Sequence, residues 1–262
     1  MRPSDRAPSV PASSDRPDRV VVGSDDRVLY LAKPPGIPVF PPHGDPRGDC
    51  LLARLLATCP PQQAPAWPEG FAGGIAHRLD VATSGLVLAA TSPDSLAWLR
   101  GLFADKLLEK RYLFLTRRQV PWDRHVVELP LAHDRRRKAR MVARRGQRTP
   151  HRGRWLDART ELRRVGRVGE LWLWEARMRT GVMHQVRLHA AMAGLALAGD
   201  RLYGGGEPTA PARALARARG LPAAPFHLHH VGLSGPGLVT PVLAPPPWWG
   251  REVADLLAES RP

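Results

Sequence analysis

The chain has 262 residues, enough for one or two domains, and 43% of them are hydrophobic. This hydrophobic content supports a buried core and excludes a wholly disordered chain. The 39 Lys and Arg residues against 24 Asp and Glu give a formal net charge of +15, and no apolar run is long enough to span a bilayer. We therefore expect a soluble, cytoplasmic protein with an anionic partner.

The first 19 residues are rich in Pro, Ser, Arg and Asp. This composition predicts a disordered tail, and the lack of an apolar segment argues against a secretory signal. Residues 20–262 are expected to form one domain, interrupted by a Pro- and Ala-rich surface insertion at 205–225. The two cysteines, Cys50 and Cys59, are too few for a disulfide framework or a zinc site.

Short apolar strands and helical segments follow one another without a regular βαβ order. Strands are predicted at 28–31, 85–89, 112–115, 160–165, 169–178 and 226–233, and helices at 92–108, 183–193 and 252–259. The helix at 92–108 begins with Ser92-Pro93-Asp94, an N-cap followed by a proline and an acid. In the strand at 169–178, Leu171 and Leu173 are expected to face the core. This pattern predicts an α/β (α+β) fold with a mixed, mainly antiparallel central sheet flanked by helices.

Basic residues are concentrated in one stretch of the chain. From Arg135 to Arg167 there are fourteen of them against two acids, Asp157 and Glu161. A solvated charged face is one interpretation of such a stretch. Nucleic-acid contact is the other, because arginine makes two-pronged contacts with phosphate.

Several common chemistries lack their motif. The chain has no phosphate-binding GxxxxGK[ST] loop, no GxGxxG after a strand, no CxxC and no GxSxG. His184 and His189 are five residues apart and would point away from each other on a helix, while His227 and His229 have no acidic companion nearby. We therefore expect neither a metal nor a nucleotide cofactor.

The most informative segment is Ala76-His77-Arg78-Leu79-Asp80, followed by Val-Ala-Thr-Ser-Gly and an apolar strand. In an extended segment, residues two apart project to the same side, so Arg78 and Asp80 would face one cleft while Leu79 points into the core. An ordinary arginine–aspartate surface pair beside a turn is equally compatible with this pattern.

Six segments together resemble the RluA-type pseudouridine synthase family. The HRLDxxTSGLxLxA stretch at 77–90 is similar to the signature of that family, as are the segments at 32–39, 109–112, 180–189, 199–204 and 228–229, in the same order along the chain. The resemblance implies the pseudouridine synthase fold and the isomerisation of uridine to pseudouridine in ribosomal or transfer RNA, without a cofactor. Asp80 matches the catalytic aspartate, which acts either as a nucleophile or as a base.

The resemblance also implies roles for four other residues. Arg187 matches the arginine that pairs with the catalytic aspartate, and it should lie on the same helix face as His184. Tyr112 matches the tyrosine that stacks on the target base. Arg78 would enter the space that the extruded nucleotide leaves, and Leu228 would pack against Asp80.

The chain departs from the family pattern in three places. Val182 replaces an arginine, His230 replaces an alanine, and the 205–225 insertion is long. Only about twenty to thirty residues precede the Lys33 segment, too few for the S4-like RNA-binding module that many relatives carry. We expect the arginine stretch, including Arg135, Arg136 and Arg137, to take over part of that role in a monomeric enzyme. Two alternatives remain open, an inactive RNA-binding protein on the same fold and a metal-dependent hydrolase that uses Asp80.

Overall fold

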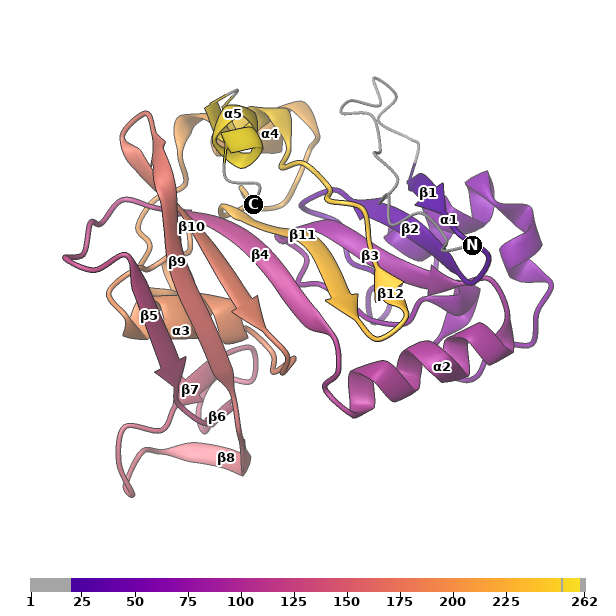
Figure 1. Ribbon diagram of the computed structural model, residues 1–262, viewed down its shortest axis with the longest axis horizontal. Coiled ribbons are helices and arrows are strands. Elements are labelled where there is room, and N and C mark those ends of the chain that lie inside the picture. Colours follow the sequence, from indigo (N-terminus) through magenta and orange to yellow (C-terminus); the bar gives the residue numbers. More distant parts are fainter. Residues whose placement is uncertain (1–19, 251, 260–262) are drawn as a thin grey trace, which may run out of the picture. The chain divides into compact units, whose positions relative to one another are not determined.

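Antiparallel strand pairs make up most of the regular structure in the computed structural model (Figure 1), which describes residues 20–250 and 252–259. The predicted tail, residues 1–19, lies outside the described residues. The chain divides into two units: Met1–Glu109 with His230–Ala244, and Lys110–His229 with Pro245–Pro262. The chain crosses from one unit to the other within β4 (Glu109–Thr116), within β11 (Leu228–Gly235) and after Ala244.

The first unit is built around a fully buried strand. Its elements are β1 (Val21–Ser24), β2 (Val28–Lys33), α1 (Leu51–Thr58), β3 (Ser84–Ala90), α2 (Pro93–Ala104) and β12 (Leu238–Val239). β2 pairs antiparallel with both β1 and β3. Leu86 and Leu88 of β3 pack with Leu96 and Leu99 of α2 in one apolar cluster. This cluster forms because α2 turns its apolar residues toward the sheet.

The beginning of α2 agrees with its predicted signals. The Ser92 hydroxyl accepts a hydrogen bond from the Ser95 amide at 3.2 Å, and Pro93 occupies the first helical position. The helix ends at Ala104 rather than at the predicted Leu108. Lys106 has a φ of 56°, a left-handed conformation that no α-helix can continue through.

The second unit contains a four-stranded antiparallel sheet in the order β4-β10-β9-β5. The other strands are β5 (Arg124–Glu128), β9 (Arg159–Val168) and β10 (Leu171–Met178). α3 (Gln185–Met192) is attached to one face of this sheet, where the side chains of Gln185 and His189 hydrogen-bond the Thr160 hydroxyl at 3.0 and 2.8 Å. Figure 1 shows α3 behind β9 and β10.

A smaller sheet in the second unit is formed by β6 (Leu131–Asp134), β7 (Met141–Ala143) and β8 (His151–Leu156), in the antiparallel order β7-β6-β8. Two helices complete the unit, α4 (Ala210–Ala218) and α5 (Glu252–Glu259). α4 lies inside the predicted 205–225 insertion and is capped by Thr209, whose hydroxyl accepts from the Ala212 amide.

The predicted mixed fold with mainly antiparallel pairing is confirmed, and besides the end of α2 two further local predictions are wrong. His184 does not lie in α3; it is the residue before the helix, with a φ of 57°. In β10, Leu173 is buried but Leu171 is only half-buried. Four consecutive residues, 173–176, are buried instead, so both faces of β10 are covered along this part of the strand. The structure also adds α1, β1, β12 and the strands β5 to β8, which were not predicted.

Among the described residues, no helix has both the length and the apolar composition needed to cross a bilayer.

Candidate active site

Asp80 lies in a turn that leads into β3, within the first unit. Arg78 is exposed, Leu79 is buried and Asp80 is half-buried, in agreement with the predicted alternation. The Thr83 amide donates to the Asp80 carbonyl at 3.0 Å, which closes the turn. The backbone around the carboxylate is therefore held in a defined conformation.

Lys33, at the end of β2, anchors this turn from inside the first unit. Its ammonium group donates to the carbonyls of Pro34, Ile37 and Val81 at 2.9, 2.7 and 3.0 Å. Three carbonyl acceptors match the three N–H groups of the charged form. Burial lowers the pKa of Lys33 to about 7, and the nearby Asp80 carboxylate opposes this by raising it. Lys33 thus fixes the residue after Asp80 and places a positive charge near its carboxylate.

Gly85, the second residue of β3, is required by the close approach of β11. It has a φ of 129°, and a Cβ at this position would lie 2.3 Å from the His230 carbonyl oxygen. No side chain fits there. His230, which stands where the family pattern has alanine, bonds through Nδ1 to the Leu86 carbonyl at 2.6 Å and packs edge-on against the His77 ring at 5.7 Å.

Arg187, on α3 of the second unit, is buried and held by a second carboxylate. Its Nε and Nη2 donate to the two oxygens of Asp200 at 2.7 and 2.9 Å, a two-pronged ion pair. The guanidinium also lies 4.4 Å from the centre of the Phe226 ring and 5.1 Å from that of Tyr203. These contacts fix the orientation of the arginine side chain.

Tyr203 links the region around Arg187 to the smaller sheet. Its hydroxyl accepts from the Met141 amide of β7 at 3.0 Å and is hydrogen-bonded to His184 Nδ1 at 2.9 Å. Burial raises the pKa of Tyr203 to about 12, so the hydroxyl stays protonated. His184 and Arg187 therefore meet at the same tyrosine, although only Arg187 lies in the helix.

Tyr112 and Leu228 also belong to the second unit. Tyr112 is a buried residue of β4 that lies opposite Ala176 of β10, and Leu228 is the buried first residue of β11. Lys110 donates to the carbonyls of Arg179 and Thr180 at 3.0 and 3.2 Å, which ties β4 to the segment before α3. The pairing of Asp80 with Arg187, the packing of Leu228 on Asp80 and the base contacts of Tyr112 and Arg78 stay predictions.

Four residues that hold the candidate site were not assigned a role from the sequence: Lys33, His184, Asp200 and Tyr203. All four lie inside the segments that resemble the family, so the motifs themselves carried the signal. Their roles depend on contacts between segments far apart in the chain, such as the one between Lys33 and Val81.

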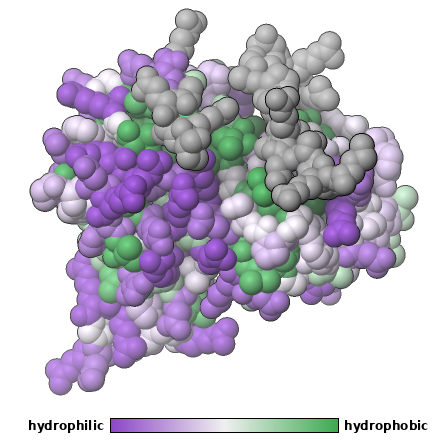
Figure 2. Space-filling view, viewed as in Figure 1, coloured by the Kyte–Doolittle hydropathy of each residue, from purple (hydrophilic) through white to green (hydrophobic). Residues whose placement is uncertain are grey.

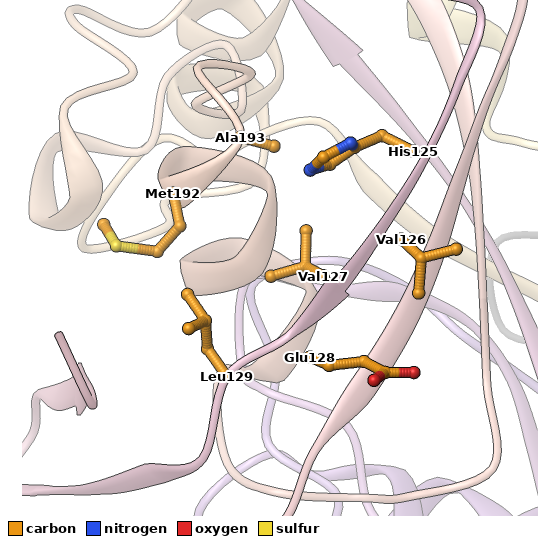
Figure 3. A pocket seen from close by; sticks show the side chains of 7 residues that line it. All are labelled: His125, Val126, Val127, Glu128, Leu129, Met192 and Ala193. Atoms are coloured by element: carbon orange, nitrogen blue, oxygen red, sulfur yellow. The ribbon is translucent and has the colours of Figure 1, made fainter.

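A shallow hollow of about 260 Å³ lies elsewhere in the second unit, between β5 and the end of α3 (Figure 3). It is lined by His125, Val126, Val127, Glu128, Leu129, Met192 and Ala193. None of the predicted site residues lines it.

The histidines considered as metal ligands have other environments. His227 is buried beside Trp248, with ring centres 4.6 Å apart, and bonds to the Ala198 carbonyl. Burial lowers its pKa to about 4. Across the part of the chain that the structure describes, no three His, Cys, Asp or Glu side chains are grouped as metal ligands would be.

The fold is that of the pseudouridine synthases. The structure of human RNA pseudouridylate synthase domain containing 1 superposes with a TM-score of 0.63 over 90% of this chain and 87% of that protein, at 19% identity. The fold predicted from the sequence is thereby confirmed.

The RNA pseudouridylate synthase family model matches residues 27–192, a range that contains Asp80, Tyr112 and Arg187. Ribosomal large subunit pseudouridine synthase D of Zymomonas mobilis is 32% identical over 70% of this chain, and that of Nitrosomonas europaea is 30% identical over 82%. The chain belongs to the RNA pseudouridylate synthase family. The alignments cover 55% and 58% of the lengths of these two relatives.

Proposed function

We propose that this protein is an RNA pseudouridine synthase that isomerises uridine in structured RNA, with Asp80 as the catalytic carboxylate. The observation that carries the proposal is the family match across the HRLD segment, together with the anchoring of that segment by Lys33. Ribosomal RNA is our first candidate substrate, because the two relatives described above are named as ribosomal large subunit enzymes. Transfer RNA is the other candidate.

The reaction needs an anionic carboxylate and no external reagent. The N1–C1′ bond of uridine breaks, the uracil turns, and a C5–C1′ bond forms while the C5 proton is lost and N1 gains one. Asp80 attacks as a nucleophile or removes a proton from the sugar, and both roles require its ionised form. Lys33 lies near this carboxylate, whose negative charge raises the pKa of Lys33 against the effect of burial.

Arg187 and Tyr112 are assigned to the same reaction through the family pattern. We propose that Arg187 supplies a fixed positive charge toward the catalytic carboxylate and that its bonds to Asp200 hold its orientation. The Tyr112 ring would stack on the everted uracil, and the exposed Arg78 would fill the gap in the RNA stack. Our proposal also includes a monomeric enzyme that acts in the cytoplasm.

Replacement of the carboxylate tests the proposal. Asp80→Ala and Asp80→Asn should lower pseudouridine formation at least about 1,000-fold, because the reacting group is lost. The measurement is tritium release from RNA that carries 5-tritiated uridine, with mapping of pseudouridine in RNA from cells with and without the gene.

Asp26→Ala is the matched control, since Asp26 is an exposed aspartate of the first unit. Its rate should equal that of the unaltered protein, and EDTA should leave the rate unchanged. Full activity of Asp80→Ala would overturn the proposal, and loss of activity with EDTA would favour the metal-dependent alternative.

A further inference from the structure

The small sheet of the second unit carries an unusually basic surface. We call residues 131–156, which comprise β6, β7, β8 and their two connections, the basic module. Nine of its basic side chains are exposed: Arg135, Arg136, Arg137, Lys138, Arg144, Arg145, Arg148, Arg152 and Arg154. The region of Figure 2 where β6 to β8 lie is predominantly hydrophilic.

These charges are not neutralised by carboxylates of the described chain. Asp134 is the single acid of the module, and its carboxylate accepts from the amides of Arg136 and Arg137 at 2.8 and 3.1 Å. Its ion pair, at 3.9 Å, is with the half-buried Arg140. Within the described residues, none of the nine exposed side chains forms an ion pair. A surface of this kind attracts a polyanion such as the RNA backbone.

β8 also carries a pair of aromatic rings beside this charge. In the pairing of β6 with β8, Leu131 lies opposite Leu156 and His133 lies opposite Arg152. The chain thus advances four positions in β8 where it advances two in β6. The extra length forms a bulge at Gly153, which has a φ of 74°. His151 and Trp155 would be about 13 Å apart in a regular strand, but the bulge brings their ring centres to 4.3 Å.

Two exposed arginines lie between the two half-buried rings in the sequence. Arg152 and Arg154 follow and precede the rings in the sequence, and both are exposed. A tryptophan with arginines next to it is the combination with which proteins bind unpaired bases, since any base stacks on the indole and the guanidinium neutralises the adjacent phosphate.

The base of the module is packed on the helix that carries Arg187. Leu131, Met141 and Ala143 form one apolar cluster with Leu188 of α3 and with Tyr203. Val182, which replaces a family arginine, is half-buried against the same cluster. RNA held by the module would therefore be held in a defined position relative to α3.

We propose that the basic module is a second RNA-binding surface, at which arginines contact the backbone and Trp155 with His151 stacks on an unpaired nucleotide. This proposal rests on the proposed function and specifies its substrate as RNA that has single-stranded nucleotides outside the reacting uridine. The substrate class is thus a hairpin or an internal loop rather than a continuous duplex.

Binding of two labelled RNAs tests the proposal, one a hairpin with a single-stranded loop and the other a duplex of equal length. Arg152→Gln with Arg154→Gln should weaken the affinity for both RNAs about tenfold and reduce the slope of log affinity against log salt by about 1.5. Arg217→Gln with Arg219→Gln removes two exposed charges at the end of α4 and is the matched control, with an expected change below about twofold. Equal affinities of the two double variants would overturn the backbone contact.

Two substitutions of Trp155 test the stacking contact. Trp155→Ala should weaken hairpin binding about tenfold and leave duplex binding unchanged, whereas Trp155→Phe should retain most of the hairpin affinity. Unchanged duplex binding also shows that the alanine variant is folded. An equal loss for both RNAs, or no loss for either, would overturn the stacking contact.

Pseudouridine formation by the unaltered protein, measured in parallel, separates the two proposals. If the unaltered protein forms pseudouridine and the module variants bind RNA as it does, the proposal of a second RNA-binding surface is overturned and the proposed function stands. Module-dependent binding without any pseudouridine formation by the unaltered protein would overturn the proposed function alone.

Discussion

At the scale of single residues, buried charges hold the groups to which the family pattern assigns the chemistry. Lys33 is 2% exposed and bonds three carbonyls, and Arg187 is 7% exposed and bonds both oxygens of Asp200. Lys33 has a carbonyl acceptor for each of its three N–H groups and Arg187 has a carboxylate partner, and such partners are the condition for keeping a charge inside a protein. The hydrogen bonds offset the free energy of desolvating these two charges. They also hold the backbone beside Asp80 and the Arg187 side chain on α3 in defined positions.

Replacement of Lys33 should therefore impair the reaction. Lys33→Met keeps the length of the side chain and removes the charge and its bond to the Val81 carbonyl, so we expect a loss of about tenfold or more in kcat. Lys106→Met, at an exposed lysine of the same unit, should retain full activity and is the control. Unchanged kcat in Lys33→Met would contradict the anchoring role.

The free energy of unfolding of Lys33→Met should also depend on pH differently from that of the unaltered protein. The folded-state pKa of Lys33 is lowered to about 7 from 10.5, so above pH 7 the unfolded chain binds the extra proton. The free energy of unfolding of the unaltered protein should thus rise relative to Lys33→Met between pH 7 and pH 10.5. Denaturant unfolding at several pH values measures the difference, and a flat difference would contradict the lowered pKa.

At the scale of elements, β10 carries a buried carboxylate that arginines of three strands share. Glu175 is fully buried, and its oxygens accept from Arg111 of β4, Arg163 of β9 and Arg177 of β10 itself. Burial alone would raise the pKa of Glu175, but Arg111 and Arg177 hold it below its usual value. Charged residues of β4, β9 and β10 thus meet at one buried carboxylate of the sheet.

Glu175→Gln should destabilise the protein by about 2 kcal/mol, because three arginines then lose their anion although they remain partly solvated. Glu161→Gln, at an exposed acid of β9, should cost less than about 0.5 kcal/mol. Chemical denaturation measures both values. Since the pKa of Glu175 is lowered, the difference between the unaltered protein and Glu175→Gln should shrink as the pH falls below 4.5. Equal stabilities of the two variants at pH 7 would rule out this role of Glu175.

At the scale of the whole molecule, buried neutral histidines make the fold sensitive to acid. Burial lowers the pKa of His227 to about 4 and also lowers that of His189. The unfolded chain binds protons at these residues near pH 6.5 while the folded chain does not, so their contribution to stability is lost as the pH falls from 6.5 to 4.

The thermal midpoint should accordingly drop between pH 7 and pH 4.5, and His227→Gln should reduce that drop by an amount equivalent to about 2 kcal/mol. Scanning calorimetry at the two pH values measures it. His43→Gln, at an exposed histidine, serves as the control. The same pH dependence in all three proteins would contradict the assignment to His227.

Local features of the chain were enough to predict much of this protein. The alternation of Arg78, Leu79 and Asp80, the start of α2 at Ser92, the antiparallel fold and the family all follow from short segments, because hydrophobic spacing, capping residues and motifs are local properties.

Long-range contacts decided the rest. The burial of Lys33 against Val81, the Arg187–Asp200 pair and the position of His184 before α3 depend on residues that only folding brings together. The same holds for the arginine stretch, which appeared in the sequence as uniform charge. Folding separates it into Arg163, which is bound to Glu175, and the exposed arginines of the basic module, because strand pairing determines which side chains meet a carboxylate and which meet water.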